Sequence, residues 1–374
     1  MRIGLNLLYL LPGVVGGTET YAVSLLQALA KLSYPAYYWL FINRETSWYG
    51  LFGEQEWNTI VCRVPAKLRL LRYAWEQFVL PLQVKRLRLD LVHSLGYVQP
   101  LRLPCKSIVT IHDLNFLNIG HTMPLSRRLA LRFFVTQSAK VADHIITVSE
   151  FSKKQIVEVL RVPPEKVMVT YNAVKKIAER PSDLNELAKK YRIVQPYILG
   201  LSSQSPHKNI AGLIKAFELL KGKGYRDLKL VLAGHRSARV TELEQVLLRT
   251  PFRDDIFFTG YVPDRVLAGL YTHAEVFVFP SFYEGFGIPI LEAFLYGAPV
   301  ACSKVAALPE IAGNAAMYFD PNNIESMANV LDYLLTHEDY RKVLITRGKE
   351  RVALFTWEET ARKTLAVYKR VLGE

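Results

Sequence analysis

The sequence predicts an α/β protein built from two parallel sheets, each covered by helices. Short apolar runs alternate with longer segments of helical periodicity, and this alternation lapses once and then restarts. A chain of 374 residues is also long enough for two domains of ordinary size. Because ligands of such proteins bind outside the carboxyl ends of the strands, we expect a ligand cleft between the two domains.

The first domain is expected over residues 1–174. Apolar runs predict its strands, and apolar side chains that recur every three or four positions predict its helices. The predicted strands are 3–8, 36–42, 90–93, 106–112, 144–148 and 166–170, and the predicted helices are 20–32, 68–87, 125–141 and 150–160. Strands that are apolar throughout indicate a parallel sheet with helices on both faces.

The second domain is expected over residues 195–356, after a linker at 175–194. Residues 173–196 include two prolines and show no strand pattern, which favours a connecting segment. The predicted strands that follow are 197–201, 228–234, 255–260, 275–281 and 297–303, and the predicted helices are 209–222, 263–274 and about 357–371.

Composition excludes several classes of protein. Half of the residues are hydrophobic and 22% are charged, which is ordinary for a globular protein and excludes a disordered chain or a coiled coil. The cysteines Cys62, Cys105 and Cys302 have no metal-ligand spacing, so we expect neither a disulfide framework nor a zinc site and favour a reducing cytosol. No apolar run reaches the ~18 residues that span a bilayer, and the first residues predict a buried strand rather than a signal peptide.

The excess of basic residues is uneven. The chain has 47 Lys and Arg against 34 Asp and Glu, a net charge of +13. Residues 63–106 contain nine basic and two acidic side chains, interleaved with leucines and aromatic residues. This pattern is typical either of an amphipathic surface for anionic lipid or of a solvated basic face. Nucleic acid is not expected as a partner because no recognition motif accompanies the charge.

Two glycine-containing segments follow predicted strands. GVVGGTE (13–19) stands between the first strand and the first helix, where glycines let the backbone approach a ligand and helix-start amides favour an anion. SFYEGFGIPILEAFLYGAPV (281–300) places Glu284 in a glycine-flanked loop and Glu292 about one turn into a helix that we expect Pro289 to start. Either glutamate alone is more often a loop acid or a solvated helix acid than a functional residue.

The two glutamates, together with the glycines and the proline between them, form a motif that is more specific than either glutamate alone. E-G-F-G-x-P-x-x-E-A resembles the E-x7-E motif of the retaining glycosyltransferase family 4, whose members have the GT-B fold of two Rossmann-like domains. Further segments match that family in the right order, namely the Gly16–Gly17 loop, WEQFVLP, TIHDL, ADHIITVSEFSK, SPHKN, LAG, TGYVPD, ALPEIAGNAA and FTWEETA. The resemblance covers nearly the whole chain and implies that the final helix (357–374 with its tail) packs back onto the first domain.

The resemblance also implies roles for the matching residues. Glu284 would bind hydroxyls of the donor sugar, Glu292 the ribose hydroxyls and Lys208 the diphosphate, since a carboxylate only accepts hydrogen bonds and suits a vicinal diol. His112 would contact the donor near the reacting carbon and the β-phosphate. The implied catalytic residues are His112, Lys208 and Glu284, and the implied donor-binding residues are Gly16, Gly17, Ser202, Ser203, Lys208, Gly234, Val262, Glu284, Gly285, Phe286, Gly287, Ile288 and Glu292.

One departure concerns the phosphate site. Family members commonly carry an Arg five or six residues before the Lys, and this chain has Ser203 and Ser202 at those positions. The site therefore has one fixed positive charge fewer, which puts in doubt a leaving group stabilised by two cations.

The implied function is transfer of a hexose, of glucose or mannose type, from a UDP- or GDP-sugar to a hydroxyl of a glycan or lipid-linked saccharide in polysaccharide biosynthesis. No metal or cofactor is implied, and the chain has no Asp-x-Asp. We expect a cytoplasmic protein held peripherally on the membrane through residues 63–106. A non-catalytic nucleotide-sugar-binding partner in a polysaccharide assembly complex stays open, as does an epimerase of the same fold, which is not expected to carry the E-x7-E loop.

Overall fold

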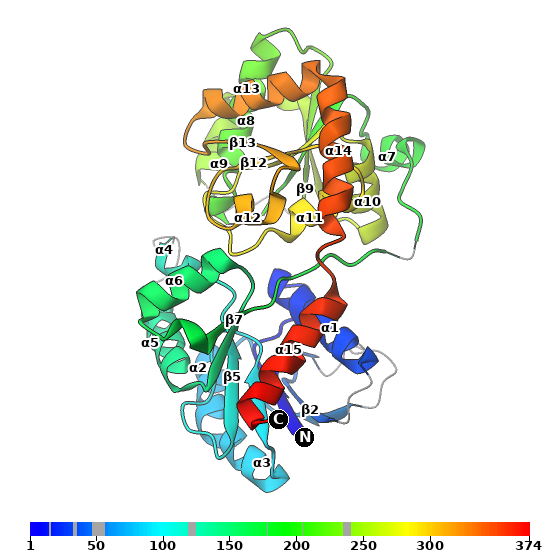
Figure 1. The fold of residues 1–374 in the computed structure, drawn as a ribbon. Coiled ribbons are helices and arrows are strands. Elements are labelled where there is room, and N and C mark those ends of the chain that lie inside the picture. Colours follow the sequence, from blue (N-terminus) through cyan, green and yellow to red (C-terminus); the bar gives the residue numbers. More distant parts are fainter. Residues whose placement is uncertain are drawn as a thin grey trace. The chain divides into compact units, whose positions relative to one another are not determined.

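The structure is a computed structural model, and it describes residues 1–14, 16–32, 36–46, 57–118, 125–177, 179–203, 205–234 and 241–374. The chain forms two compact units, which we call unit 1 (Met1–Asn172 with Thr356–Glu374) and unit 2 (Ala173–Phe355). Each unit contains one parallel sheet between helices (Figure 1). The prediction of an α/β protein with two parallel sheets is confirmed.

Unit 1 contains a seven-stranded sheet in the order β3-β2-β1-β4-β5-β6-β7. Its strands are β1 (Arg2–Asn6), β2 (Tyr37–Ile42), β3 (Asn58–Val61), β4 (Leu91–Ser94), β5 (Lys106–Thr110), β6 (His144–Thr147) and β7 (Val167–Val169). Its helices are α1 (Gly17–Lys31), α2 (Arg69–Ala74), a π-helical turn (Trp75–Val79), α3 (Leu80–Leu87), α4 (Asn115–Asn118), α5 (Leu125–Val141), α6 (Glu150–Leu160) and α15 (Trp357–Leu372).

Successive side chains along the strands of unit 1 point to the two faces of the sheet, and a separate layer of helices covers each face. On one face, Ile3 and Leu5 of β1 join a core with α1 and with Tyr368 of α15. On the other face, Val109 of β5 packs in a core with Val135 of α5, and α3 and α6 cover the same side. Burial on both faces explains why the central strands are mostly apolar.

Unit 2 contains a six-stranded sheet in the order β10-β9-β8-β11-β12-β13. Its strands are β8 (Tyr197–Leu201), β9 (Lys229–Ala233), β10 (Ile256–Gly260), β11 (Val276–Phe279), β12 (Val300–Ser303) and β13 (Ala316–Phe319). Its helices are α7 (Leu184–Tyr191), α8 (Ile210–Gly222), α9 (Thr241–Arg249), α10 (Asp264–His273), α11 (Ile288–Leu295), α12 (Leu308–Ala312), α13 (Ile324–Thr336) and α14 (Glu338–Val352). Helices α8, α9 and α13 share one core on one face of this sheet.

The expected linker contains a helix that was not predicted, and at the end of the second domain β13, α12, α13 and α14 were not predicted either. Residues 175–194 contain α7, whose Glu186 forms a two-pronged ion pair with Arg265 of α10 at 2.7 and 2.8 Å. The segment is therefore part of unit 2, which begins at Ala173. Its helix has only eight residues and lies in a segment without a strand pattern, which is why the segment was predicted to be a linker.

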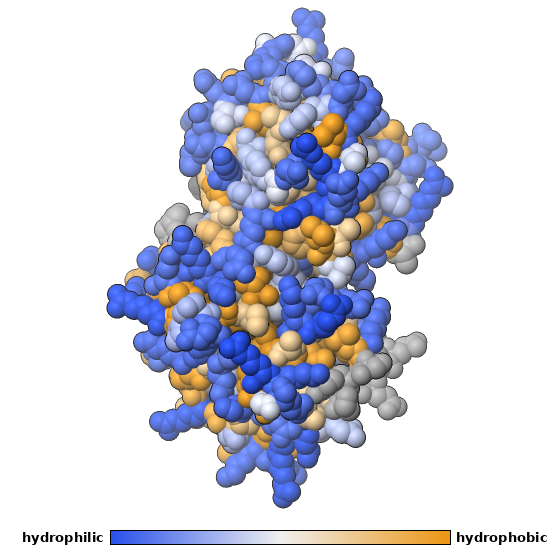
Figure 2. Space-filling model, in the orientation of Figure 1, coloured by the Kyte–Doolittle hydropathy of each residue, from blue (hydrophilic) through white to orange (hydrophobic). Residues whose placement is uncertain are grey.

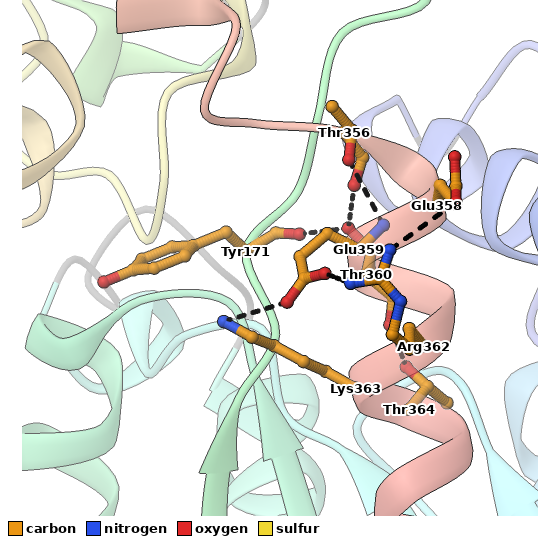
Figure 3. A network of polar contacts seen from close by, with 8 residues as sticks. All are labelled: Tyr171, Thr356, Glu358, Glu359, Thr360, Arg362, Lys363 and Thr364. Atoms are coloured by element: carbon orange, nitrogen blue, oxygen red, sulfur yellow. Dashed lines mark hydrogen bonds and ion pairs between the residues drawn. The ribbon is translucent and has the colours of Figure 1, made fainter.

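Polar contacts inside unit 1 join the two segments at which the chain passes between the units. Thr360 Oγ1 donates to the carbonyl of Tyr171 at 2.6 Å, and the Lys363 ammonium lies 5.8 Å from the Tyr171 ring centroid. Thr356 caps α15 by accepting from the amide of Glu359 at 3.2 Å. Figure 2 shows the surface of the molecule, and Figure 3 shows these contacts around the first turns of α15.

Candidate functional site

Most of the predicted site residues lie along one edge of the unit 2 sheet. Ser202 and Ser203 follow β8, Gly234 follows β9, Val262 lies beyond β10, and residues 284–288 lie beyond β11. Since every strand of this sheet is parallel, these positions all belong to the carboxyl edge, where ligands of α/β proteins bind.

An ion pair joins Lys208 and Glu284 at this edge. The Lys208 ammonium lies 2.6 Å from Oε1 of Glu284, and the two side chains are only 24% and 15% exposed. The same ammonium lies 5.0 Å from the ring centroid of Phe279. Their strands β8 and β11 are neighbours at the point where the strand order reverses, so the pair marks the topological switch point of the sheet.

The start of α11 presents backbone amides beside this pair. The helix begins at Ile288, one residue earlier than expected, with Pro289 in its second position and Gly287 before it at φ 119°. Within the described residues, the amides of Gly287 and Ile288 donate to no protein acceptor, although Gly287 is buried. Gly285 and Phe286 already have partners. Unpaired amides at a helix start favour an anion.

Glu292 lies one turn further along α11 and is held by a tyrosine. The hydroxyl of Tyr271 in α10 donates to Oε2 of Glu292 at 3.0 Å. Burial raises the pKa of the Glu292 carboxyl, the Tyr271 hydrogen bond lowers it, and the nearby Asp264 carboxylate raises it. Oε1 of Glu292 has no hydrogen-bond partner in the part of the chain that the structure describes.

The backbone after β8 and β9 is closely packed. Gly234 has φ 114°, and a Cβ atom there would lie 2.3 Å from the carbonyl oxygen of Ser202, so only glycine fits. Ser202 donates its amide hydrogen to the carbonyl of Ala233 at 2.7 Å, and Ser203 Oγ accepts from the amide of Ser205 at 3.1 Å. Val262 is buried. The two serines thus stabilise the loop that leads to Lys208.

Unit 1 brings a second set of predicted residues to the carboxyl edge of its own sheet. Gly16 precedes α1 with φ 58°, and a Cβ atom built there would contact nothing within 4 Å. Gly17 is the first residue of α1, and Glu19 in the first turn accepts from the amide of Gly13 at 2.8 Å. The loop is therefore open above Gly16 and is braced from its own helix.

His112 is buried and held on three sides. Its Nε2 donates to the carbonyl of Leu95 at 3.1 Å, because a carbonyl can only accept. The ring of Tyr21 meets it edge-on at 4.8 Å between centroids, and Tyr97, itself at φ 60°, lies at 5.4 Å. Burial lowers the pKa of His112 to about 4, so the imidazole is neutral and its Nδ1 is an acceptor.

A series of buried hydrogen bonds that sequence analysis did not predict supports Tyr21. Tyr368 of α15 bonds to Nδ1 of His93 at 2.7 Å, Nε2 of His93 bonds to Thr110 at 2.7 Å, and Thr110 bonds to the hydroxyl of Tyr21 at 3.2 Å. His93 is buried, and both of its ring nitrogens are hydrogen-bonded in the interior. Such partners come from distant parts of the chain, so no local pattern could have predicted them.

Two further features are absent from the described ranges, namely a cluster of metal ligands and a membrane-spanning helix. No three His, Cys, Asp or Glu side chains there are grouped as metal ligands would be. Nor does any helix in those ranges combine the length and the apolar character that crossing a bilayer requires.

Comparisons with known proteins show the family of this chain. The profile of glycosyltransferase family 4 matches residues 15–176, and that of glycosyl transferases group 1 matches residues 185–351. The O-antigen chain mannosyltransferase B of Escherichia coli is 33% identical over 280 residues, which cover 74% of this chain and 73% of that protein. The chain belongs to glycosyltransferase family 4.

Solved structures show the fold of this family-4 glycosyltransferase. Sucrose-phosphate synthase from Thermosynechococcus elongatus aligns over 100% of this chain and 99% of its own with a TM-score of 0.79 and 19% identity. Anabaena HepE, in complex with UDP and glucose, aligns over 99% of each chain with a TM-score of 0.77 and 18% identity. The predicted GT-B fold is confirmed.

Proposed function

We propose that this glycosyltransferase transfers a hexose with retention of its anomeric configuration from a UDP- or GDP-sugar to a hydroxyl of a glycan or lipid-linked saccharide in polysaccharide biosynthesis. The observation that carries the proposal is the partly buried Lys208–Glu284 pair beside the unpaired amides of Gly287 and Ile288. The similarity to an O-antigen chain mannosyltransferase favours a mannosyl donor.

The donor diphosphate would bind at the Lys208 ammonium and the start of α11. In this arrangement Lys208 shares its charge between Glu284 and the diphosphate, and it draws closer to the diphosphate as negative charge grows on the leaving oxygen. Glu284 would then orient toward a sugar hydroxyl while staying within reach of Lys208. Oε1 of Glu292 would accept from the ribose hydroxyls.

His112 would act on the donor sugar as an acceptor. A neutral imidazole that donates through Nε2 to Leu95 can offer Nδ1 only to a hydrogen-bond donor. A phosphate oxygen offers no hydrogen, so this tautomer favours a sugar hydroxyl over the β-phosphate. Our sequence-based expectation of a β-phosphate contact is therefore replaced by a hydroxyl contact in this proposal.

The chemical step would need no enzyme nucleophile. The bond between the anomeric carbon and the diphosphate oxygen breaks, the acceptor oxygen bonds to that carbon from the same face, and the departing diphosphate oxygen takes the acceptor proton. The protein would contribute positioning and stabilisation of the charge on the diphosphate. We propose that Lys208 and the helix amides do so without a metal ion.

We also propose that unit 1 attaches the enzyme to an anionic membrane surface. Leu70, Phe78 and Leu82 in residues 63–106 are 80%, 74% and 67% exposed, and the basic residues of this segment other than Arg72 are exposed as well. Helix α5 extends this apolar surface, since its Leu129 and Phe133 are also exposed and its Phe134 ring lies 4.6 Å from the Tyr73 ring of α2. Figure 2 shows apolar areas among hydrophilic ones on the visible face of unit 1.

A second candidate is a nucleotide-sugar-binding protein without catalytic activity. Ser202 and Ser203 in place of the family's Arg favour it, because they leave one cation fewer at the diphosphate. Release of free nucleoside diphosphate from a donor in the absence of acceptor would exclude it.

The binding part of the proposal is tested by a thermal-shift panel of UDP, GDP, ADP and their sugars. Specific binding raises the melting temperature by mass action, and we expect UDP or GDP and the matching sugar to do so. Glu292→Gln should remove most of the shift, whereas Glu242→Gln, an exposed acid on α9, should keep it. No shift with any nucleotide would contradict the proposed function.

A further inference from the structure

Tyr271 is a fully buried tyrosine whose hydroxyl bonds to a carboxylate. It is 0% exposed, and its ring meets Phe277 of β11 edge-on at 5.0 Å between centroids. Its ring also stacks on Tyr296 at 6.3 Å with 13° between the planes. Two aromatic neighbours thus fix the ring, and the hydroxyl oxygen lies 3.0 Å from Oε2 of Glu292.

A carboxylate at the end of a glutamate side chain can rotate about its last torsion, which is broad. A donor on one oxygen stops that rotation and leaves the other oxygen in a defined place. In Glu292 the engaged oxygen is Oε2, and Oε1 has no partner among the described residues.

We propose that Tyr271 is the positioning residue of the ribose-binding carboxylate. It fixes Glu292 through Oε2 so that Oε1 meets the vicinal hydroxyls of a nucleoside diphosphate. This inference rests on the proposed function, because it assumes that Glu292 binds the ribose.

The support for Tyr271 continues to the segment that enters unit 2. The amide of Ile177 donates to the hydroxyl of Tyr296 at 3.4 Å, and Tyr296 stacks on Tyr271. A series of contacts therefore leads from the backbone amide of Ile177 through the rings of Tyr296 and Tyr271 to the carboxylate of Glu292. Its members lie on the entering segment, α10 and the end of α11, so the site depends on residues outside the E-x7-E motif.

Tyr197 provides a matched control. It is also 0% exposed in unit 2, and its hydroxyl donates to the carbonyl of Leu270 at 2.7 Å. Tyr271→Phe and Tyr197→Phe each remove one buried hydroxyl and keep the ring, so both lose a buried hydrogen bond. Only the first touches Glu292.

The experiment measures dissociation constants of UDP and GDP, and of the 2′,3′-dideoxy form of whichever binds, for the wild type and both variants. We expect Tyr271→Phe to weaken binding of the ribonucleotide about tenfold and binding of the dideoxynucleotide little, so that the preference for ribose is largely lost. Tyr197→Phe should keep the wild-type preference. In a Glu292→Gln background, Tyr271→Phe should have no further effect on affinity.

An unchanged ribose preference in Tyr271→Phe would overturn the inference and leave the proposed function standing. An equal loss of preference in both variants would also overturn it, since that result indicates a general loss of packing. If the wild type bound neither UDP nor GDP, the proposed function would fall and this inference with it.

Discussion

Lys208 and Glu284 are the residues on which the proposed chemistry depends, and each partly neutralises the other. Their 2.6 Å contact is partly buried, so breaking it leaves a charge in a poorly hydrated place. In the proposed function, a donor would bring a diphosphate to Lys208 and a sugar hydroxyl to Glu284, and so would supply a new partner to both at once. The pair therefore keeps the site ordered before the donor arrives.

The first prediction separates the two members of this pair. Lys208→Ala should lower kcat by about 10²–10³ and raise the Kd for donor much less, because charge on the diphosphate grows in the transition state. Glu284→Gln should lower kcat yet leave nucleoside diphosphate affinity unchanged or improved, since it releases Lys208. Steady-state kinetics and calorimetry measure both.

Lys215→Ala is the matched control for this prediction. It removes a lysine that pairs with Glu242 at 3.3 Å on the exposed side of the same unit. If Lys208→Ala changed kcat no more than Lys215→Ala did, Lys208 would be a binding residue at most.

The second prediction concerns the pH dependence of nucleotide binding. Burial raises the pKa of Glu292 above that of an ordinary glutamate, the Tyr271 hydroxyl opposes this, and Asp264 adds to it. Only the ionised carboxylate accepts from both ribose hydroxyls, so affinity should fall as the pH drops through this raised pKa. Titration calorimetry between pH 8 and 4.5 measures it.

Glu292→Gln isolates this effect from titration of the nucleotide itself. In that variant the affinity for the nucleotide should be lower than in the wild type at neutral pH. It should not show the additional fall on acidification that protonation of Glu292 causes in the wild type. The same pH profile in wild type and variant would show that Glu292 does not bind the ribose.

Residues of the site differ in how far sequence could predict them. Glu284 and Glu292 lie in one contiguous motif, and Lys208 and Gly234 follow strands, so pattern and resemblance identified them as candidates. Tyr271 was not found because its partner lies 21 positions away on another helix. The sequence could not indicate the positive φ of Tyr97, because glycine is the residue that usually adopts such a backbone conformation.

Among the elements, α2, the π-helical turn and α3 carry the surface that is proposed to meet the membrane. Lys67, Arg69, Lys85 and Arg86 are exposed there. Arg72 differs from them, because its side chain is 11% exposed and lies 3.8 Å from the buried carboxylate of Glu76. Arg72 is thus a structural residue and does not belong to the lipid-facing set.

The third prediction is that vesicle binding has an electrostatic and an apolar part. Changing Lys67, Arg69, Lys85 and Arg86 to Gln should release the protein from anionic vesicles, since each cation contributes about 1 kcal/mol. Changing Leu70, Phe78 and Leu82 to Ser should remove the binding that survives high salt. Sedimentation with vesicles measures both.

Two exposed leucines of unit 2 serve as controls, because Leu248 and Leu354 are 75% and 66% exposed. Serine at these positions should leave sedimentation unchanged, and nucleotide binding should be intact in every variant. If the unit 1 variants sedimented with vesicles as the wild type does, the basic and apolar surface of unit 1 would be a solvated face that does not bind lipid.

For the whole molecule, the α/β alternation was sufficient to predict two parallel sheets and most of their strands. Strand β3 was missed because only a partly apolar run marks it, and its residues are largely exposed at the sheet edge. Helix α7 was missed because it has only eight residues and lies in a segment without a strand pattern. Only the family resemblance predicted that α15 packs on unit 1. The apolar side of α15 contacts α1, which is far away in the sequence, so no local pattern could indicate this contact.

The central claim is tested most directly by following candidate donors with the wild type and Lys208→Ala by proton NMR in the presence of EDTA. GDP-mannose, UDP-glucose and UDP-galactose are each incubated with the enzyme and a simple glycoside acceptor. We predict that one donor is consumed, that the first product carries the anomeric configuration of that donor, and that Lys208→Ala slows consumption at least a hundredfold. A product of inverted configuration, or consumption that EDTA abolishes or that Lys208→Ala leaves unchanged, would contradict the account.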